Sequence, residues 1–191
     1  MECHLEVVYR IIQYLKATPG KGVLFKNNRR FTMEAYTDTD WVGSVVDRRS
    51  TSGYCTFLEG NLVTWRSKKQ AVVVRSSVKA EFRAMAHGIC ELLWLKIIME
   101  DLGIEWEGSM KLYCDNKSAI SIAHNPVQHD RTKHVEVDRH FIKEKLDCGL
   151  TCTPYISINE QLADILTKGL PSHSFKQITS KLGMENICTS A

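Results

Sequence analysis

Hydrophobic positions along the first third of the chain change from a helical to a strand spacing. In residues 4–17 apolar side chains recur every three or four positions, and Thr18-Pro19-Gly20 follows, which predicts an amphipathic helix that ends there. Runs typical of β-strands come next, at 22–25, 33–38, 53–58 and 61–66. Glu59-Gly60 separates the last two runs, a spacing typical of a tight hairpin. These runs predict an antiparallel meander.

The rest of the chain alternates helical and strand patterns. The longest helical pattern covers 77–102, where Gly88 is the only interruption and Gly103 ends the helix. Further strands are expected at 111–115 and 150–156, and further helices at 117–124, 135–146, 160–167 and 172–182. This order predicts an α/β fold with a mixed sheet flanked by helices.

Composition narrows the class of protein. The 191 residues are 43% hydrophobic and 25% charged, with a net charge of +3, which excludes a collagen, a coiled-coil array and a disordered tail. The longest apolar stretches, such as 71–74 and 92–95, fall far short of the roughly 20 residues that a membrane span needs. The start of the chain carries an acid and a histidine where a signal peptide would be apolar, so we expect an intracellular protein that is not secreted.

Seven scattered cysteines form no Cys-x-x-Cys pair. An odd number without paired spacing is typical of reduced thiols rather than of a disulfide framework. We therefore expect reduced cysteines, most of them buried.

Four carboxylates occupy positions that favour a shared site. Asp38 and Asp115 each close a predicted strand, and sites in α/β sheets form outside the carboxyl ends of strands. Glu81 lies on the apolar stripe of the long helix, where a carboxylate needs a partner or a metal. Asp164 follows the last strand in a short helix. The pattern predicts that the four acids converge.

Such a cluster of oxygen ligands suits magnesium or manganese. Two such ions would activate a water and stabilise the leaving oxygen of a phosphodiester. Simpler roles stay open, because an Asp at a strand end is often a turn or cap residue and a Glu on a helix often pairs with an Arg. Asp40 lies on the same strand face as Asp38 and is an alternative to it.

The net charge of the whole chain hides a strongly basic segment. Residues 48–83 contain eight basic side chains and two acids, a local balance of +6. That balance is consistent with a phosphate-binding surface, and a solvated basic face is the alternative. The candidate nucleic-acid contacts are Arg48, Arg49, Lys68, Lys69, Arg75 and, after the strand at 111–115, Asn116.

Several long motifs follow one another in an order that we recognise. They are RIIQYLKATPGKG (10–22), AYTDTDWVGSVVDRRSTSGYCTFL (35–58), TWRSKKQ (64–70), RSSVKAEFRAMA (75–86), LYCDNKSAI (112–120), RTKHVEVDRHFIKEK (131–145) and NEQLADILTKGLP (159–171). With them the chain resembles the ribonuclease H domain of copia-type retrotransposon Pol polyproteins, plant elements above all, preceded by a short reverse transcriptase tail. The resemblance covers nearly the whole chain.

The resemblance implies a ribonuclease H-like fold, a five-stranded mixed sheet in which three antiparallel strands precede a long helix and parallel strands. It implies a metal-dependent endonuclease that cleaves the RNA strand of an RNA–DNA hybrid. The implied catalytic and metal-binding residues are Asp38, Glu81, Asp115 and Asp164. They would hold two magnesium ions, for which manganese is a substitute, and no small-molecule cofactor is implied.

The same resemblance divides the chain into a reverse transcriptase tail (1–30), a ribonuclease H-like domain (31–170) and a C-terminal helix and tail (171–191). The implied partners are an RNA–DNA hybrid and the reverse transcriptase portion of the same polyprotein, in the cytoplasm (a virus-like particle) or the nucleus and away from membranes. Cellular ribonucleases H carry a mobile histidine before the last acid, and His134 is the nearest histidine upstream of that stretch. The alternative function is a catalytically silent retrotransposon relic, or a co-opted nucleic-acid-binding module with the same fold.

Overall fold

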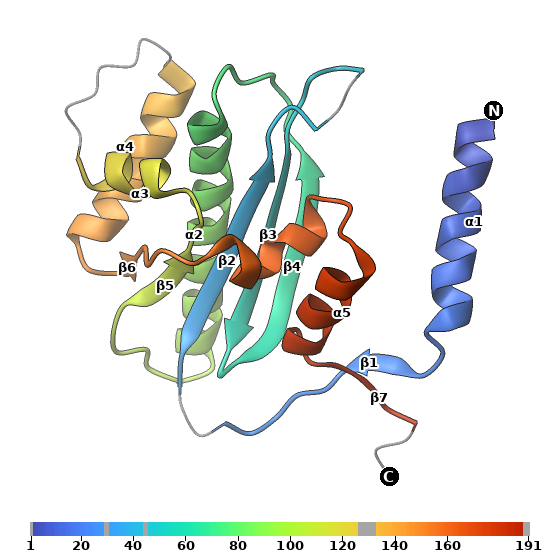
Figure 1. The fold of residues 1–191 in the computed structure, drawn as a ribbon. Helices are drawn as coiled ribbons and strands as arrows, with labels where there is room; N and C mark the ends of the chain where they lie inside the picture. The colour runs from blue at the N-terminus through green and yellow to red at the C-terminus, as the bar shows by residue number, and fades with distance from the viewer. Residues whose placement is uncertain (1, 29–30, 44–45, 126–132, 189–191) are drawn as a thin grey trace.

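A five-stranded mixed sheet organises the computed structural model, which describes residues 2–28, 31–43, 46–125 and 133–188 (Figure 1). The strand order is β4-β3-β2-β5-β6. The strands are β2 (Met33–Asp40), β3 (Thr51–Leu58), β4 (Asn61–Lys69), β5 (Met110–Tyr113) and β6 (Thr151–Cys152). β2, β3 and β4 pair antiparallel, whereas β5 runs parallel to β2 and β6 parallel to β5. The predicted mixed sheet, with three antiparallel strands first, is confirmed.

The hairpin between β3 and β4 forms where the sequence places it. Glu59 and Gly60 link the two strands with φ values of 52° and 73°, a left-handed pair whose twist matches that of the strands. Gly60 adopts this conformation without steric cost, whereas Glu59 is one of the few non-glycine residues in that region.

Helices cover both faces of the sheet (Figure 1). On one face lie α2 (Ser77–Asp101), α3 (Lys117–His124) and α4 (Lys133–Asp147). On the other face the short 3₁₀ helix η2 (Leu162–Leu166) contacts β2 and β3, and α5 (Ser172–Lys181) packs beside it. A further 3₁₀ turn, η1 (Ile158–Glu160), precedes η2. The predicted helix at 160–167 is therefore wrong in type, because this segment forms two 3₁₀ turns.

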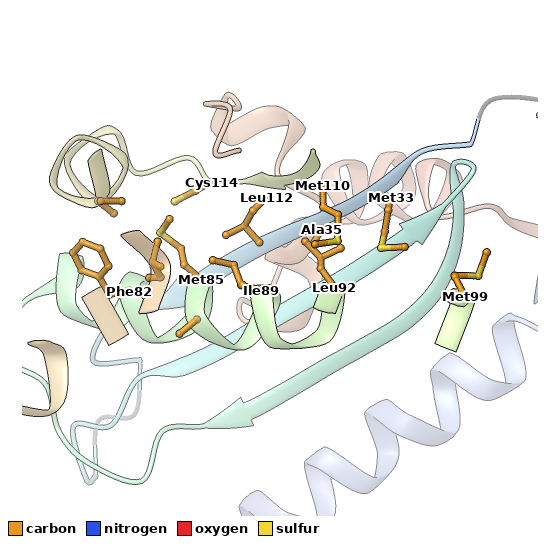
Figure 2. Packing of buried hydrophobic residues seen from close by; sticks show 14 residues of the cluster. Met33, Ala35, Phe82, Met85, Ile89, Leu92, Met99, Met110, Leu112 and Cys114 are labelled. Carbon is orange, nitrogen blue, oxygen red and sulfur yellow. The ribbon is translucent and has the colours of Figure 1, made fainter. Parts of the chain in front are cut away.

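The main core fills the space between α2 and the sheet (Figure 2). Met85, Ile89 and Leu92 of α2 are fully buried against it. Gly88 explains how close the helix comes, since a Cβ there would lie 2.6 Å from Thr37 Cγ2 and 2.8 Å from a Leu112 methyl group. The glycine that interrupts the helical pattern is thus a packing requirement, and each fully buried apolar side chain contributes about 1.5–3 kcal/mol.

The run at 22–25 does not join the meander, contrary to the prediction. Its strand, β1 (Lys21–Val23), pairs antiparallel with β7 (Met184–Asn186) in a separate two-stranded sheet. An ion pair of 2.6 Å between Lys26 and Glu185 joins the same two segments. Local pattern cannot predict a partner more than 150 residues away. The division into 1–30, 31–170 and 171–191 remains a prediction, although the first and last of these segments pair with each other.

The predicted strand at 150–156 is shorter than expected. Only Thr151–Cys152 pairs continuously with β5, followed by a single bridge between Cys114 and Tyr155. Pro154 lies between them and has no N–H to donate to a neighbouring strand, which explains the interruption.

The N-terminal helix α1 (Glu2–Ala17) forms as predicted but packs on little of the described chain. Its large apolar side chains, among them Leu5, Ile12 and Leu15, are 41–63% exposed. A ring contact between Tyr14 and Phe175, 6.2 Å between centroids, links it to α5. No described helix is both long and apolar enough to span a membrane.

The six described cysteines are all free thiols, as expected. Cys55 and Cys114 are buried, whereas Cys90, Cys148 and Cys188 are exposed. The expectation that most of them are buried is wrong, because only two of the six described cysteines are buried and composition alone does not reveal which side of an element a thiol occupies.

Candidate active site

The four predicted acids meet beside the carboxyl ends of β2 and β5. Carboxylate oxygens of Asp38, Asp115 and Asp164 lie within 4.8 Å of one another. A second group within the same limit joins Glu81, the Cys114 sulfur and Asp115. Asp115 belongs to both groups and therefore links the acid from α2 to the acids from β2 and η2.

Three of the four carboxylates are buried and Asp115 is half-buried, and this burial favours the protonated forms of Glu81, Asp115 and Asp164. Asp38, Glu81 and Asp164 are only 1%, 5% and 6% exposed. Burial, and then repulsion from Asp38 and Asp115, raises the pKa of Glu81 to about 9. Burial likewise raises the pKa of Asp164 to about 6 and that of Asp115 above its ordinary value. The site would gain stability from a cation that compensates this charge.

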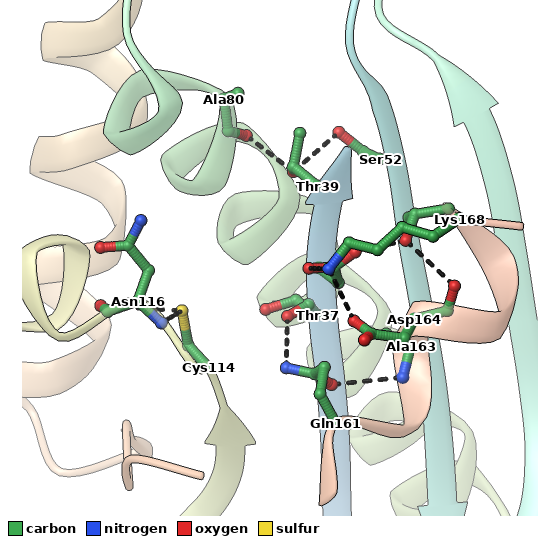
Figure 3. Close-up of polar contacts among 12 residues, drawn as sticks. Thr37, Thr39, Ser52, Ala80, Cys114, Asn116, Gln161, Ala163, Asp164 and Lys168 are labelled. Carbon is green, nitrogen blue, oxygen red and sulfur yellow. Dashed lines mark hydrogen bonds and ion pairs between the residues drawn. The ribbon is translucent and has the colours of Figure 1, made fainter. Parts of the chain in front are cut away.

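Lys168 supplies one cation to the cluster. Its Nζ donates to Asp38 Oδ1 at 3.0 Å and to Asp164 Oδ1 at 2.9 Å (Figure 3). Burial alone would lower the pKa of Lys168, but the two carboxylates outweigh it and raise that pKa. The Thr167 hydroxyl donates to the other oxygen of Asp38. Our reading of the sequence missed Lys168, although its position four residues after Asp164 was the available signal.

The donor set fits hard divalent cations. Glu81 Oε2 is buried without a hydrogen-bond partner among the described residues, so one oxygen of the cluster is left without compensation. The other donors are carboxylate oxygens, the ligands that magnesium and manganese prefer. Burial, and then Glu81, raises the pKa of the Cys114 thiol, so it stays protonated and is a poor ligand for such ions.

Close packing fixes η2, and with it Asp164, against the sheet. A Cβ on Gly53 would lie 2.8 Å from both Leu166 Cβ and Thr167 Cγ2, so the absence of a side chain there lets η2 lie on β3. Gln161, fully buried, donates to the Thr37 carbonyl at 3.0 Å. Asp164 is thereby held opposite Asp38.

Two further candidates are Asp40 and His134. Asp40 belongs to neither group of clustered atoms among the described residues, and its carboxylate lies against Gly43. The backbone of His134 lies in the first turn of α4, and its side chain is outside the described residues. The structure thus places Asp40 outside the acid cluster, and the prediction for His134 lies outside the described side chains.

Five of the six predicted nucleic-acid contacts lie exposed on the protein surface. Exposed members are Arg48, Arg49, Lys68, Lys69 and Arg75. Arg49 and Lys69 both pair with Asp47, at 3.7 and 3.2 Å. Asn116 caps α3, since its Oδ1 accepts a hydrogen bond of 3.0 Å from the Ala119 N–H. The cap uses the side-chain oxygen of Asn116, so the side-chain amide nitrogen is the group that could donate a hydrogen bond to a ligand.

Comparisons of sequence point to one kind of protein. The chain is 39% identical over 186 residues, 97% of its length, to the retrovirus-related Pol polyprotein from transposon RE1 of Arabidopsis thaliana. It is 35% identical over 183 residues, 96% of its length, to the Pol polyprotein from transposon TNT 1-94 of Nicotiana tabacum. It spans only 13% and 14% of these two relatives. No protein-family model matches the chain.

A solved structure supports the fold. LC11 ribonuclease H1, solved in complex with an RNA/DNA hybrid, superimposes with a TM-score of 0.52 at 13% sequence identity. The match covers 71% of this chain and 94% of that one. At this identity the likeness concerns the fold alone. Together with the sequence relatives, it identifies the chain as a ribonuclease H-like domain of the retrotransposon Pol polyprotein family.

Proposed function

We propose that the chain is a metal-dependent endonuclease that cleaves the RNA strand of RNA–DNA hybrids during retrotransposon reverse transcription. The observation that carries this proposal is the largely buried cluster of Asp38, Glu81, Asp115 and Asp164, in which one glutamate oxygen has no partner among the described residues. LC11 ribonuclease H1, which shares the fold, was solved with an RNA/DNA hybrid, and this supports the same substrate class here.

The four acids would hold two magnesium ions, with manganese as a substitute. When bound, such ions make a water nucleophilic and stabilise the leaving oxygen of a phosphodiester. The chain itself shields the acids from water, because three of them are at most 6% exposed. It also holds them rigidly, because the hydrogen bond from Gln161 to the Thr37 carbonyl fixes η2 on the sheet. Lys168 holds Asp38 and Asp164 in place and offsets part of their charge before ions bind.

Recognition of the hybrid falls to the surrounding surface. Cations at Arg48, Arg49, Lys68, Lys69 and Arg75 would contact phosphates, which give affinity without sequence preference. The Asn116 amide nitrogen, beside Asp115, would donate to a sugar or a base. RNA would be distinguished from DNA by its 2′-hydroxyl groups across the minor groove.

The exposed apolar face of α1 supports a further part of the proposal. A helix whose large apolar side chains are about half exposed needs a covering surface, and the relatives are polyproteins about seven times longer than this chain. We place α1 against the reverse transcriptase portion of the same polyprotein. The domain would then act inside the cell, in a cytoplasmic virus-like particle or in the nucleus.

Variants of the acids test the proposed site. Asn in place of Asp38, Asp115 or Asp164, and Gln in place of Glu81, should each lower magnesium-dependent cleavage of a hybrid at least roughly 100-fold, because each removes a charged ligand of the ions. Asp40→Asn is the matched control, since Asp40 lies on the same strand but outside the cluster, and it should keep activity within about threefold. Cleavage of a labelled RNA strand gives the rates.

Binding separates the nuclease from its alternative. Asp115→Asn should still bind the hybrid, because it removes no cation from the surface. Hybrid binding by the unsubstituted chain without cleavage, in magnesium and in manganese, would support a silent relic or a binding module instead.

A further inference from the structure

A cavity of about 430 Å³ lies between α2 and the strands β3 and β4. Its walls carry five basic side chains, among them Arg66, Lys68, Arg83 and His87, and no acid from the described part of the chain. Tyr54 and Ala84 are buried and contribute apolar surface. A cationic wall beside an apolar surface, in a volume typical of small-ligand sites, suits one nucleotide unit with its phosphate.

The cavity is separate from the acid cluster. In the sheet register Arg66 lies opposite Tyr54 and Lys68 opposite Ser52, so all four side chains point to one face of the sheet. Thr39, opposite Ser52, contacts the Ala80 carbonyl of α2 on that face (Figure 3). Asp38, the preceding residue, contacts Thr167 and Lys168, directly after η2, on the other face. Two strand spacings, about 10 Å, separate β2 from β4.

Electrostatics indicates a negatively charged occupant. No described acid forms an ion pair with Lys68, whereas Arg83 lies 3.7 Å from Asp138 and Lys69 pairs with Asp47. The pKa of His87 is lowered by burial and also by repulsion from Arg66, Arg83 and Lys68, despite an opposing effect of Asp138. Several positive charges therefore repel one another around His87, and a bound phosphate would reduce this repulsion.

The innermost wall adds an acceptor. Gln70 is 5% exposed, and its side-chain nitrogen donates to Ser52 Oγ at 2.7 Å and to the Ala80 carbonyl at 3.1 Å. Its Oε1 is buried without a partner among the described residues. A water or a sugar hydroxyl beside the phosphate would satisfy it.

We propose that this cavity binds a backbone phosphate, with its sugar, of a nucleic-acid strand that extends beyond the cleavage site. The inference rests on the proposed function and deepens it, because it divides the basic segment into cations that converge on one cavity and cations spread over the surface. Free phosphate or a free nucleotide offers the same chemistry, and the experiment distinguishes these sources.

The test uses the full chain with Asp115→Asn in a buffer without magnesium. Both measures keep the hybrid from being cleaved during the binding experiment. Arg66→Met with Lys68→Met removes two cations from the cavity. Lys176→Met with Lys181→Met, on α5, removes two exposed cations from the other face and is the matched control. Hybrid binding is measured by fluorescence anisotropy between about 50 and 300 mM salt, after circular dichroism confirms that each variant is folded.

The cavity variant should lose about tenfold in affinity near 0.1 M salt, and its slope of log affinity against log salt should fall by about 1, the effect of one lost phosphate contact. The control should change that slope by much less. Equal effects of the two double variants would overturn the proposal, since any two surface charges would then serve as well.

A second arm titrates inorganic phosphate and follows the ring resonances of His87 by NMR, assigned with His87→Gln. Phosphate should raise the pKa of His87 in the parent chain and not in the Arg66→Met/Lys68→Met variant. A phosphate response with no change in hybrid binding would overturn the assignment to a strand in favour of a free phosphate. Cleavage by the unsubstituted chain is measured separately. A chain that does not cleave but binds phosphate in the cavity would contradict the proposed nuclease activity and still support the cavity.

Discussion

Glu81 shows most clearly how a single residue reports on the site. The buried apolar face of α2 carries this carboxylate. It lies near Asp38 and Asp115, and one of its oxygens has no hydrogen-bond partner among the described residues. Its pKa of about 9 means that the folded, metal-free protein keeps a proton there that the unfolded chain has lost. This proton links stability to pH.

Glu81→Gln should therefore stabilise the metal-free protein at alkaline pH. Between pH 4.5 and about 9 the folded state binds more protons than the unfolded state, so the free energy of unfolding falls as pH rises through that window. Glutamine cannot titrate. Urea unfolding in EDTA should give similar stabilities at pH 5, and at pH 8 a variant more stable by a few kcal/mol, to order of magnitude. A difference that stays constant from pH 5 to 8 would show that the pKa of Glu81 is ordinary.

Lys168→Met should destabilise the metal-free protein at neutral pH. The substitution leaves Asp38 and Asp164 buried without their cation, a cost of about 1–2 kcal/mol because a third of the lysine is exposed and water screens the pair. Magnesium should then raise the melting temperature of the variant more than that of the parent chain, since the ions replace the lost charge. Thermal unfolding with and without magnesium measures both, and Lys181→Met is the control. Equal melting temperatures in EDTA would contradict a structural role for Lys168.

These residues also show what sequence alone can reveal. The four acids were predictable because strand ends and a misplaced polar residue on an apolar stripe are local signals. The i,i+4 spacing to Asp164 is the one local signal for Lys168, and its contact with Asp38 could not be predicted because the two residues lie 130 positions apart and meet only once η2 packs on β3.

At the scale of elements, periodicity predicted long elements well and short ones poorly. The pattern at 77–102 matches α2 to within a residue, since many buried side chains repeat at helical spacing. The strands β1 and β7 have three residues each, too few for a pattern, and the pairing between them is set by tertiary contacts. The 3₁₀ helix η2 is also short, with five residues, and it lies against β2 and β3.

Removal of α1 should leave the domain folded. Since its described contacts are few and its apolar side chains are largely exposed, a chain that begins at residue 18 should lose less than about 1 kcal/mol in the free energy of unfolding. The full chain should self-associate more than the shortened one, because only the full chain carries the exposed apolar face of α1, which a second copy could cover. Urea unfolding and analytical ultracentrifugation measure the two effects. A loss above about 3 kcal/mol would show that α1 belongs to the folded core.

For the whole molecule, the order of elements was enough to predict a mixed α/β sheet, and the succession of motifs narrowed that class to a ribonuclease H-like fold. Both agree with the observed strand order and with the sequence relatives. From the sequence, the positive charge could be assigned only to a segment of the chain, residues 48–83, and not to a surface of the fold. Which of its cations converge, around the cavity between α2 and β4, depends on the register of β3 and β4.

The central claim is that this buried cluster of acids makes the domain a ribonuclease. Its most direct test is the product of the purified chain acting on a hybrid with an end-labelled RNA strand in magnesium. We predict RNA fragments with 3′-hydroxyl and 5′-phosphate ends, no cleavage of the DNA strand, and no fragments with Asp115→Asn. An intact RNA strand in both magnesium and manganese, with the hybrid bound by a folded protein, would contradict the claim.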